Sequence, residues 1–165
     1  MSEPNTAAVG PGVEEDDAIA DDKYLTFELG AESYGIEIQH VREIIGIQPV
    51  TTIPDVPAWI CGVINLRGKV IPVASARRRF GLPDREADAR TCIIVVDVEQ
   101  DWFGLVVDTV SEVLDITPDL IQPPPPVFQA AKDHFLSGVG KTGDQVRLLL
   151  DAPRMFAHSD ARVSA

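Results

Sequence analysis

The residue types that can perform catalysis occur in this sequence, but their spacing does not assemble a catalytic site. The acids Asp97, Asp101 and Asp108 fall on predicted strands and a turn with no His or Lys set beside them, so we interpret them as solvated strand faces. Ser111 is not part of a Gly-x-Ser-x-Gly motif, and the sequence has neither a phosphate-binding loop nor a dinucleotide fingerprint. We therefore expect that the protein is not an enzyme. The alternative, a small enzyme that uses its carboxylates, requires a pocket in which acids converge.

The residues that could bind a metal are equally dispersed. His40, His134 and His158 have no Cys, His or carboxylate at a metal-ligand spacing. Cys61 and Cys92 lie in apolar surroundings without a Cys-x-x-Cys motif, which fits buried thiols in a reducing cytoplasm better than disulfides. We expect neither a metal nor another cofactor.

The charge of the chain limits its partners. The formal net charge is −12, and residues 1–22 contain seven acids and no Lys or Arg. Phosphate binding requires clustered cations, so we expect no nucleic acid and no anionic membrane surface as partner. The one cluster, Arg77-Arg78-Arg79, is either a solvated helix face or a protein-contact patch. The sequence shows no signal peptide and no run of about 20 apolar residues, so we expect a cytoplasmic protein without membrane insertion.

An internal repeat sets the organisation of the chain. Residues 24–45 align without a gap on residues 93–114, so that Tyr34-Gly35-Ile36 falls on Phe103-Gly104-Leu105. Self-similarity at one fixed offset indicates one structural unit used twice. A unit of roughly 65–70 residues buries only about 60% of its unfolded surface, which favours a shared interface. We expect a domain over residues 23–158 with two halves, roughly 23–90 and 91–158, packed face to face.

The hydrophobic pattern predicts short strands. Apolar and polar residues alternate over 25–29, and apolar runs follow at 93–98, 102–107 and 146–150. The spacing of Val41, Ile44 and Ile45 fits a short helical turn or an irregular strand end. Many short strands with Gly and Pro turns indicate an all-β fold of two small barrels.

A few segments are expected outside the strands. Residues 76–80 form a helical turn with Ser75 as a possible N-cap, and residues 151–158 form a C-terminal helix capped by Asp151. The prolines at 123–126 require an extended backbone. Residues 1–22 are predicted to be a disordered acidic tail, and residues 159–165 a frayed end.

One turn distinguishes the two copies. Only the first contains Asn65-Leu66-Arg67-Gly68, in which the glycine can take a positive φ. Arg67 is either a solvated cation at a hairpin tip or an anchor at a protein interface. Glu43 is either a surface acid or the partner of Arg67.

Several motifs follow one another in a fixed order. They are Tyr34-Gly35-Ile36, Val41-Arg42-Glu43-Ile44-Ile45, Gly-Val-Ile-Asn-Leu-Arg-Gly-Lys-Val-Ile-Pro-Val at 62–73, Phe80-Gly81-Leu82, Val110-Ser111-Glu112-Val113-Leu114 and Gly138-Val139-Gly140-Lys141. Together they resemble the CheW coupling proteins of bacterial chemotaxis over about residues 24–156. The resemblance implies two packed, five-stranded, SH3-like β-barrels with short helical turns. It also implies a non-catalytic adaptor that links the cytoplasmic tips of transmembrane chemoreceptors to the histidine kinase CheA.

The resemblance also implies where partners bind. The candidates for receptor contact are Val41, Glu43, Ile44, Asn65, Leu66 and Arg67. Four further positions match family positions tied to partner binding: Gly62, Gly104, Val113 and Gly138. Ala74-Ser75-Ala76 departs from the Ile-Asp-Leu usual in the family, which affects the surface expected to meet the kinase. An adaptor of a non-flagellar array, controlling pili or biofilm, is the alternative function.

Overall fold

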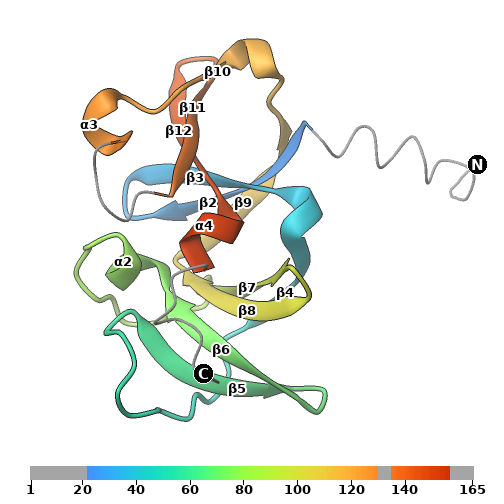
Figure 1. The fold of residues 1–165 in the computed structure, drawn as a ribbon, viewed down its shortest axis with the longest axis vertical. Coiled ribbons are helices and arrows are strands. Elements are labelled where there is room, and N and C mark those ends of the chain that lie inside the picture. The colour runs from blue at the N-terminus through green and yellow to red at the C-terminus, as the bar shows by residue number, and fades with distance from the viewer. Residues whose placement is uncertain (1–21, 130–134, 157–165) are drawn as a thin grey trace, which may run out of the picture.

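The structure, a computed structural model, describes residues 22–129 and 135–156, and it is built from two antiparallel-rich sheets (Figure 1). The first copy of the repeat supplies β2 (Lys23–Leu29), β3 (Glu32–Glu37), β4 (Val41–Gly46), β5 (Ile60–Leu66) and β6 (Lys69–Ser75). The second supplies β7 (Cys92–Val98), β8 (Asp101–Val107), β9 (Thr109–Asp115), β10 (Ile121–Gln122), β11 (Leu136–Thr142) and β12 (Gln145–Leu150). The prediction of an all-β fold is confirmed. One sheet has the five strands expected of each barrel, and the other has six because it includes the two-residue strand β10.

Each sheet takes strands from both copies of the repeat. The six-stranded sheet has the order β10-β11-β12-β3-β2-β9, and the five-stranded sheet has the order β4-β7-β8-β6-β5. The expectation that residues 23–90 and 91–158 each form one barrel is therefore wrong. The hairpin β2–β3 leaves its own copy and pairs with β9 and β12, while the hairpin β7–β8 pairs with β4 and β6.

Three apolar clusters follow from this exchange. One lies inside the curved five-stranded sheet and contains Leu66 and Val95, and a smaller one inside the six-stranded sheet contains Tyr24 and Leu149. The largest lies between the sheets and takes side chains from both. Helix α4 (Ala152–Phe156) packs against this central cluster, where the rings of Phe103 and Phe156 stack with centroids 4.5 Å apart.

The five-stranded sheet closes on itself at Gly62. Thr51, in the loop after β4, exchanges two backbone hydrogen bonds of 2.9 Å with Val63 of β5. Gly62 has φ +149°, and a Cβ there would overlap the Thr51 carbonyl oxygen and lie 2.8 Å from Val50 Cγ1. Only glycine fits both the backbone conformation and the space, so Gly62 serves the closure of the sheet.

The predicted helix caps are confirmed. Ser75 Oγ accepts a hydrogen bond from the Arg78 backbone N–H at 3.1 Å at the start of α2 (Ala76–Arg79). Asp151 Oδ1 accepts one from the Arg154 N–H at 3.0 Å at the start of α4. The remaining short helices are η1 (Ile38–His40), η2 (Pro118–Leu120) and α3 (Pro126–Gln129).

The structure corrects one expectation for the irregular segments and decides between two alternatives for another. Pro126 begins α3 instead of continuing the extended segment, because proline is well accommodated in the first turn of a helix. Residues 41–46 form the strand β4 with a bulge between Val41 and Glu43, so the irregular strand end was the better alternative. The predicted acidic tail, apart from Asp22, and the predicted frayed end lie outside the described residues.

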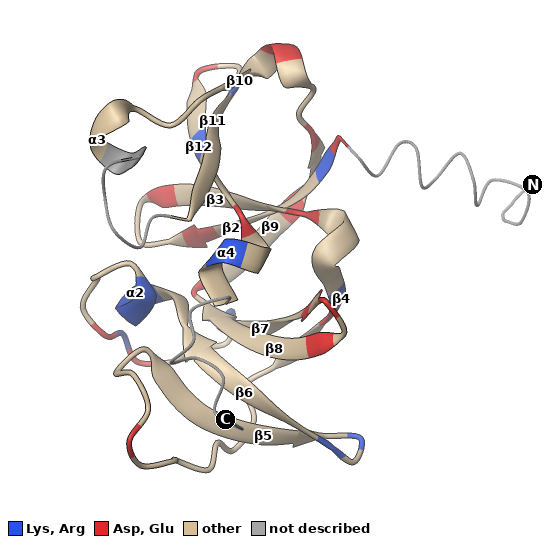
Figure 2. Ribbon diagram, in the orientation of Figure 1, with Lys and Arg blue, Asp and Glu red and all other residues tan. Residues whose placement is uncertain are grey.

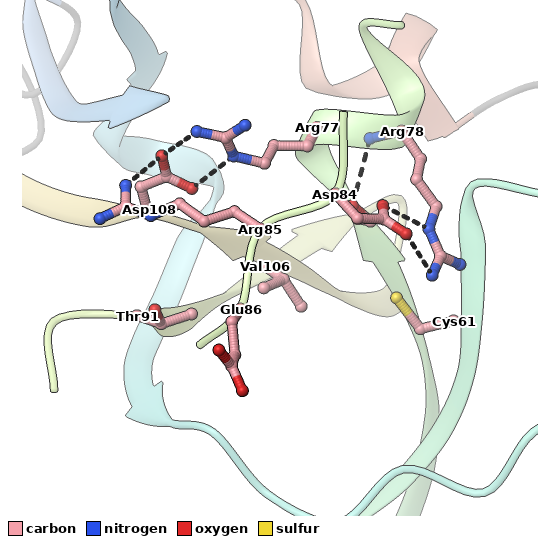
Figure 3. Close-up of a pocket in the computed structure, with 10 residues that line it drawn as sticks. Cys61, Arg77, Arg78, Asp84, Arg85, Glu86, Thr91, Val106 and Asp108 are labelled. Atoms are coloured by element: carbon pink, nitrogen blue, oxygen red, sulfur yellow. Dashed lines mark hydrogen bonds and ion pairs between the residues drawn. The ribbon is translucent and has the colours of Figure 1, made fainter. Parts of the chain in front are cut away.

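Asp108 joins the two sheets where β8 passes into β9 (Figure 3). Its carboxylate accepts from Arg77 Nε at 2.9 Å and Nη2 at 2.7 Å, from Arg85 Nη1 at 2.9 Å and from the Gly30 backbone N–H at 2.8 Å. Gly30 lies in the β2–β3 turn, Arg77 on α2, and Arg85 in the segment between the copies. The side chain of Asp108 is only 9% exposed. The expectation of a solvated Asp108 is therefore wrong.

The cationic cluster is likewise structural. Helix α2 carries all three arginines (Figure 2), and Arg77 is bound to Asp108. Arg78 forms two hydrogen bonds to Asp84 at 3.0 and 3.2 Å, and the Arg79 guanidinium lies over the rings of Trp59 and Phe135. The solvated-face alternative is wrong for Arg77 and Arg79, which are largely covered, and the protein-contact patch stays a prediction.

Gly62→Ala should destabilise the fold by at least about 2 kcal/mol, because the new Cβ meets backbone that cannot move without opening the sheet. Urea unfolding measures the change. Gly46→Ala is the matched control, since no atom lies within 4 Å of its Cβ position. Equal stability of the two variants would show that the Thr51–Val63 closure contributes little.

Asp108→Asn should lower the free energy of unfolding by about 1.5–3 kcal/mol at neutral pH, since charge-assisted hydrogen bonds are lost. The hydrogen bonds from Arg77, Gly30 and Arg85 hold the pKa of Asp108 far below its ordinary value. A lowered native pKa stabilises the fold above the unfolded pKa of about 3.9, and this contribution declines as the pH falls below it. The stability gap between wild type and variant should therefore be constant from pH 7 to about 5 and shrink below about 4. A gap that widens with acid would contradict this account.

Candidate functional site

The Asn-Leu-Arg-Gly turn lies at one end of the five-stranded sheet, which we call the Arg67 end. Arg67 Nη2 donates to Glu43 Oε2, so the turn between β5 and β6 is tied to β4 across the end of the sheet. The pairing of the two residues considered from the sequence is confirmed. This hydrogen bond raises the pKa of the Arg67 guanidinium above its ordinary value. The Arg67 side chain is 64% exposed and that of Glu43 is 27% exposed, so a partner can reach the pair.

The turn holds Arg67 in an unusual backbone conformation. Arg67 has φ +51° and Gly68 has φ +87°, as in the two-residue hairpin turns that match the twist of the strands. The Asn65 side-chain carbonyl accepts from the Gly68 N–H at 2.9 Å and fixes this geometry. Asn65 therefore orients the turn, while Arg67 presents its charge.

The other predicted site residues divide into exposed and buried positions. Ile44 on β4 is 45% exposed, and Val113 on β9 is 47% exposed. The repeat makes them equivalent, and each stands opposite a residue of the central cluster, Ile44 opposite Ile94 and Val113 opposite Leu25. The structure does not bring them to the Arg67 end together with the ion pair.

Four predicted site residues are buried. Leu66 is 5% exposed and belongs to the cluster inside the five-stranded sheet. A Cβ at Gly104 would lie 2.8 Å from Ile93 Cγ2, and a Cβ at Gly138 would lie 2.7 Å from Ile121 Cγ2. Together with Gly62, these residues shape the backbone and make no surface of their own.

Sequence reasoning missed an aromatic residue at the Arg67 end. Trp102 on β8 lies beneath two cations, with Arg42 Cζ and Lys69 Nζ each 4.0 Å from the ring centroid. The signal was available, because Trp102 aligns on Ser33 of the first copy and so differs between the copies. The Arg67 end thus combines an ion pair, an aromatic ring and two further cations.

The carboxylates do not form an acid–base site. A cavity of about 220 Å³ lies beneath the segment 83–91 and is lined by Asp84, Glu86, Asp108 and Cys61, among others (Figure 3). The carboxylates of Asp84 and Asp108 accept hydrogen bonds from arginines. These bonds keep both groups ionised and use the oxygens that would otherwise exchange a proton with a substrate. Burial raises the pKa of the Cys61 thiol, which makes it a poorer nucleophile. Within the described residues, no three His, Cys, Asp or Glu side chains gather into a possible metal site, and no helix is long and apolar enough to cross a membrane.

Comparisons with known proteins agree with the fold. A family model described as a CheW-like domain matches residues 23–160. The chemotaxis protein CheW of Klebsiella aerogenes is 36% identical over 138 residues, covering 84% of this chain and 83% of that protein. Protein FrzA of Myxococcus xanthus is 30% identical over 123 residues, covering 74% of this chain and 77% of that protein.

A solved structure gives the same result in three dimensions. The crystal structure of the scaffolding protein TtCheW from Thermoanaerobacter tengcongensis has a TM-score of 0.76 and 37% identity, covering 84% of this chain and 94% of that chain. The family match spans most of the sequence and includes every strand of both sheets. The chain belongs to the CheW-like domain family.

Proposed function

We propose that this chain is a non-catalytic adaptor that couples the cytoplasmic tips of chemoreceptors to the histidine kinase CheA in chemotaxis signalling. The Klebsiella aerogenes relative is named a chemotaxis protein, and the solved relative is named a scaffolding protein. The carboxylates of the described cavity are held in ion pairs, which supports a binding role over acid–base catalysis. The adaptor acts in the cytoplasm and is recruited to receptor arrays at the membrane.

The single observation that carries the proposal is the exposed Arg67–Glu43 pair. The Arg67 backbone has a positive φ, which is unfavourable for an arginine, and the hydrogen bond from the Gly68 N–H to the Asn65 side chain holds the turn in this geometry. An exposed ion pair contributes only about 0–1 kcal/mol to folding. The same pair contributes more to binding when a partner covers it and excludes water. We infer that Arg67 and Glu43 form the centre of the receptor contact.

An adaptor for a non-flagellar chemosensory array is the second candidate. The similarity to protein FrzA, which does not carry the name CheW, supports keeping it. Both candidates use the same fold and the same Arg67 end, so they differ in the receptors and the kinase that bind. Identifying which kinase is captured from the native organism separates them.

Arg67→Ala should leave the melting temperature close to that of wild type and weaken binding to a receptor-tip fragment. A charged anchor at the centre of an interface contributes about 2 kcal/mol or more, which corresponds to about thirtyfold in affinity. Arg67→Glu should bind more weakly still, because the reversed charge then faces Glu43 and the partner alike. Isothermal titration calorimetry with the fragment measures the affinity, and kinase activation measures the consequence.

The matched control is Lys141→Ala, an exposed cation in the corresponding β11–β12 hairpin of the other sheet. It should bind the fragment as wild type does. The exchange Glu43→Arg with Arg67→Glu should recover part of the lost affinity, because the two residues pair within the chain. An Arg67→Ala protein that binds normally, or that fails only because it is unfolded, would remove Arg67 from the proposed contact.

A further inference from the structure

The Arg67 end carries a stack of cations on an aromatic ring that the adaptor function does not explain. Trp102 projects from β8, Arg42 from β4 and Lys69 from the start of β6, and both cationic groups lie 4.0 Å from the centroid of its ring. We call these three residues the Trp102 stack. Cations over an indole ring are attracted by its quadrupole, so the ring holds two positive charges close together on the surface.

The stack has more positive charge than its neighbours neutralise. Asp97 lies opposite Trp102 on β7, and its carboxylate is 3.5 Å from Arg42 Nη1, which is an ion pair without a hydrogen bond. Among the described residues, no carboxylate lies within ion-pair distance of Lys69. Asp101 neighbours Trp102 in sequence but points to the other face of the strand. Lys69 therefore lacks a counter-charge on a protein whose net charge is −12.

The equivalent end of the six-stranded sheet has no such stack. Ser33 stands where the repeat places Trp102, and its hydroxyl accepts from Arg147 Nη1 at 2.6 Å. Ser111 stands where the repeat places Arg42, and it donates to Glu28 at 3.1 Å. The same backbone thus does not require the stack, so the three residues at the Arg67 end need another explanation.

We propose that the acidic N-terminal segment of this same chain binds across the Trp102 stack. Glu14-Glu15-Asp16-Asp17 provides four successive carboxylates, and residues 1–22 hold no Lys or Arg to oppose them. The complementary partner of Lys69 and Arg42 is therefore within the chain. The segment is tied to the body where the Asp22 carbonyl accepts from the Ile116 N–H at 2.8 Å.

The position of that attachment allows the contact. In Figure 1, strand β2 begins above β4 at the same edge of the view, and the tip of the β5–β6 hairpin lies at the lower end of that edge. The ribbon of the hairpin tip is blue, the colour of Lys and Arg, on this side (Figure 2). Residues 14–17 precede Asp22 by five to eight residues, which span roughly 17–28 Å when extended. A tether of this length gives an effective concentration in the millimolar range, so a weak ionic contact is enough to form it.

The consequence for binding rests on the proposed function. Lys69 directly follows the Arg67-Gly68 turn, so a segment on the stack partly covers the Arg67–Glu43 pair. The acidic segment then competes with the receptor tip for the Arg67 end. A contact closed about half of the time lowers receptor affinity about twofold, and partners that displace the segment relieve this reduction.

Nuclear magnetic resonance of the full-length chain tests the contact without any partner. The chain has two tryptophans, so the Trp102 indole N–H reports on the stack and the Trp59 indole N–H is an internal control. Trp59 lies in the turn before β5 and packs with Arg79 of α2. The test variant carries Glu14→Gln, Glu15→Gln, Asp16→Asn and Asp17→Asn. It should shift the Trp102 signal and leave the Trp59 signal in place, and about 1 M NaCl should move the wild-type signal in the same direction.

Two backgrounds identify the residue that the segment meets. In Lys69→Gln, neutralising the four acids should shift the Trp102 signal much less than in wild type. In Lys141→Gln, at the other hairpin, the shift should be as large as in wild type. An unchanged Trp102 signal, or equal shifts of both indoles, would overturn the proposal. A shift that grows with protein concentration would assign the contact to a second copy and would equally overturn it.

Receptor binding separates this inference from the proposed function. The neutralised variant should bind a receptor-tip fragment about twofold more tightly than wild type. If Trp102 shifts but Arg67→Ala binds the fragment normally, the intramolecular contact stands and the receptor site lies elsewhere. If Arg67→Ala loses binding but Trp102 does not shift, the adaptor site stands and the acidic segment does not cover it.

Discussion

Parallel pairing between strands of different copies is the constraint on which the rest of the structure depends. β12 lies beside β3 and β6 lies beside β8, each in parallel register, so the hairpin of one copy completes the sheet of the other. Parallel neighbours cannot be joined by a tight turn, and here the chain makes the connection by crossing between the sheets. Neither copy can form its sheet alone. Two halves too small for a stable core therefore share one, and the central cluster exists only when both hairpins are exchanged.

Both copies have a glycine at the point where their strands pair in parallel, because neighbouring side chains leave no room for a Cβ there. Gly35 stands opposite Leu149, and Gly104 stands opposite Val73. A Cβ at Gly35 would lie 2.9 Å from Leu149 Cδ2, and a Cβ at Gly104 would lie 2.8 Å from Ile93 Cγ2. Side chains fill these gaps from within each sheet, so both copies require glycine at the same point. The ends of the sheets carry no such restriction, and there the copies have diverged.

Local patterns were sufficient to predict local structure. The strands and the caps at Ser75 and Asp151 depend on residues whose spacing or repeat position is visible in the sequence, whereas the pairing of Glu43 with Arg67 was one of two open alternatives. The exchange of hairpins was not predictable, because periodicity says which face of a strand is buried and not which strand lies beside it. The role of Asp108 was missed for a related reason. Its partners Arg77, Arg85 and Gly30 come from three separate segments, and only the folded chain brings them together.

The two sheets have similar folds, but their ends carry different side chains, so a partner can distinguish one end from the other. At the end of the six-stranded sheet, Arg147 is buried and its guanidinium donates to the neutral oxygens of Ser33, Thr142 and Gln145, so its hydrogen bonds are directed inward. At the other end, Arg67 directs its charge outward to Glu43 and to solvent. Charged groups at an interface select partners and fix their register more than they add affinity. Two similar ends would let a partner bind in either of two orientations. Because the arginine charge points outward at one end and inward at the other, a partner that requires the exposed Arg67–Glu43 pair meets the scaffold in one way.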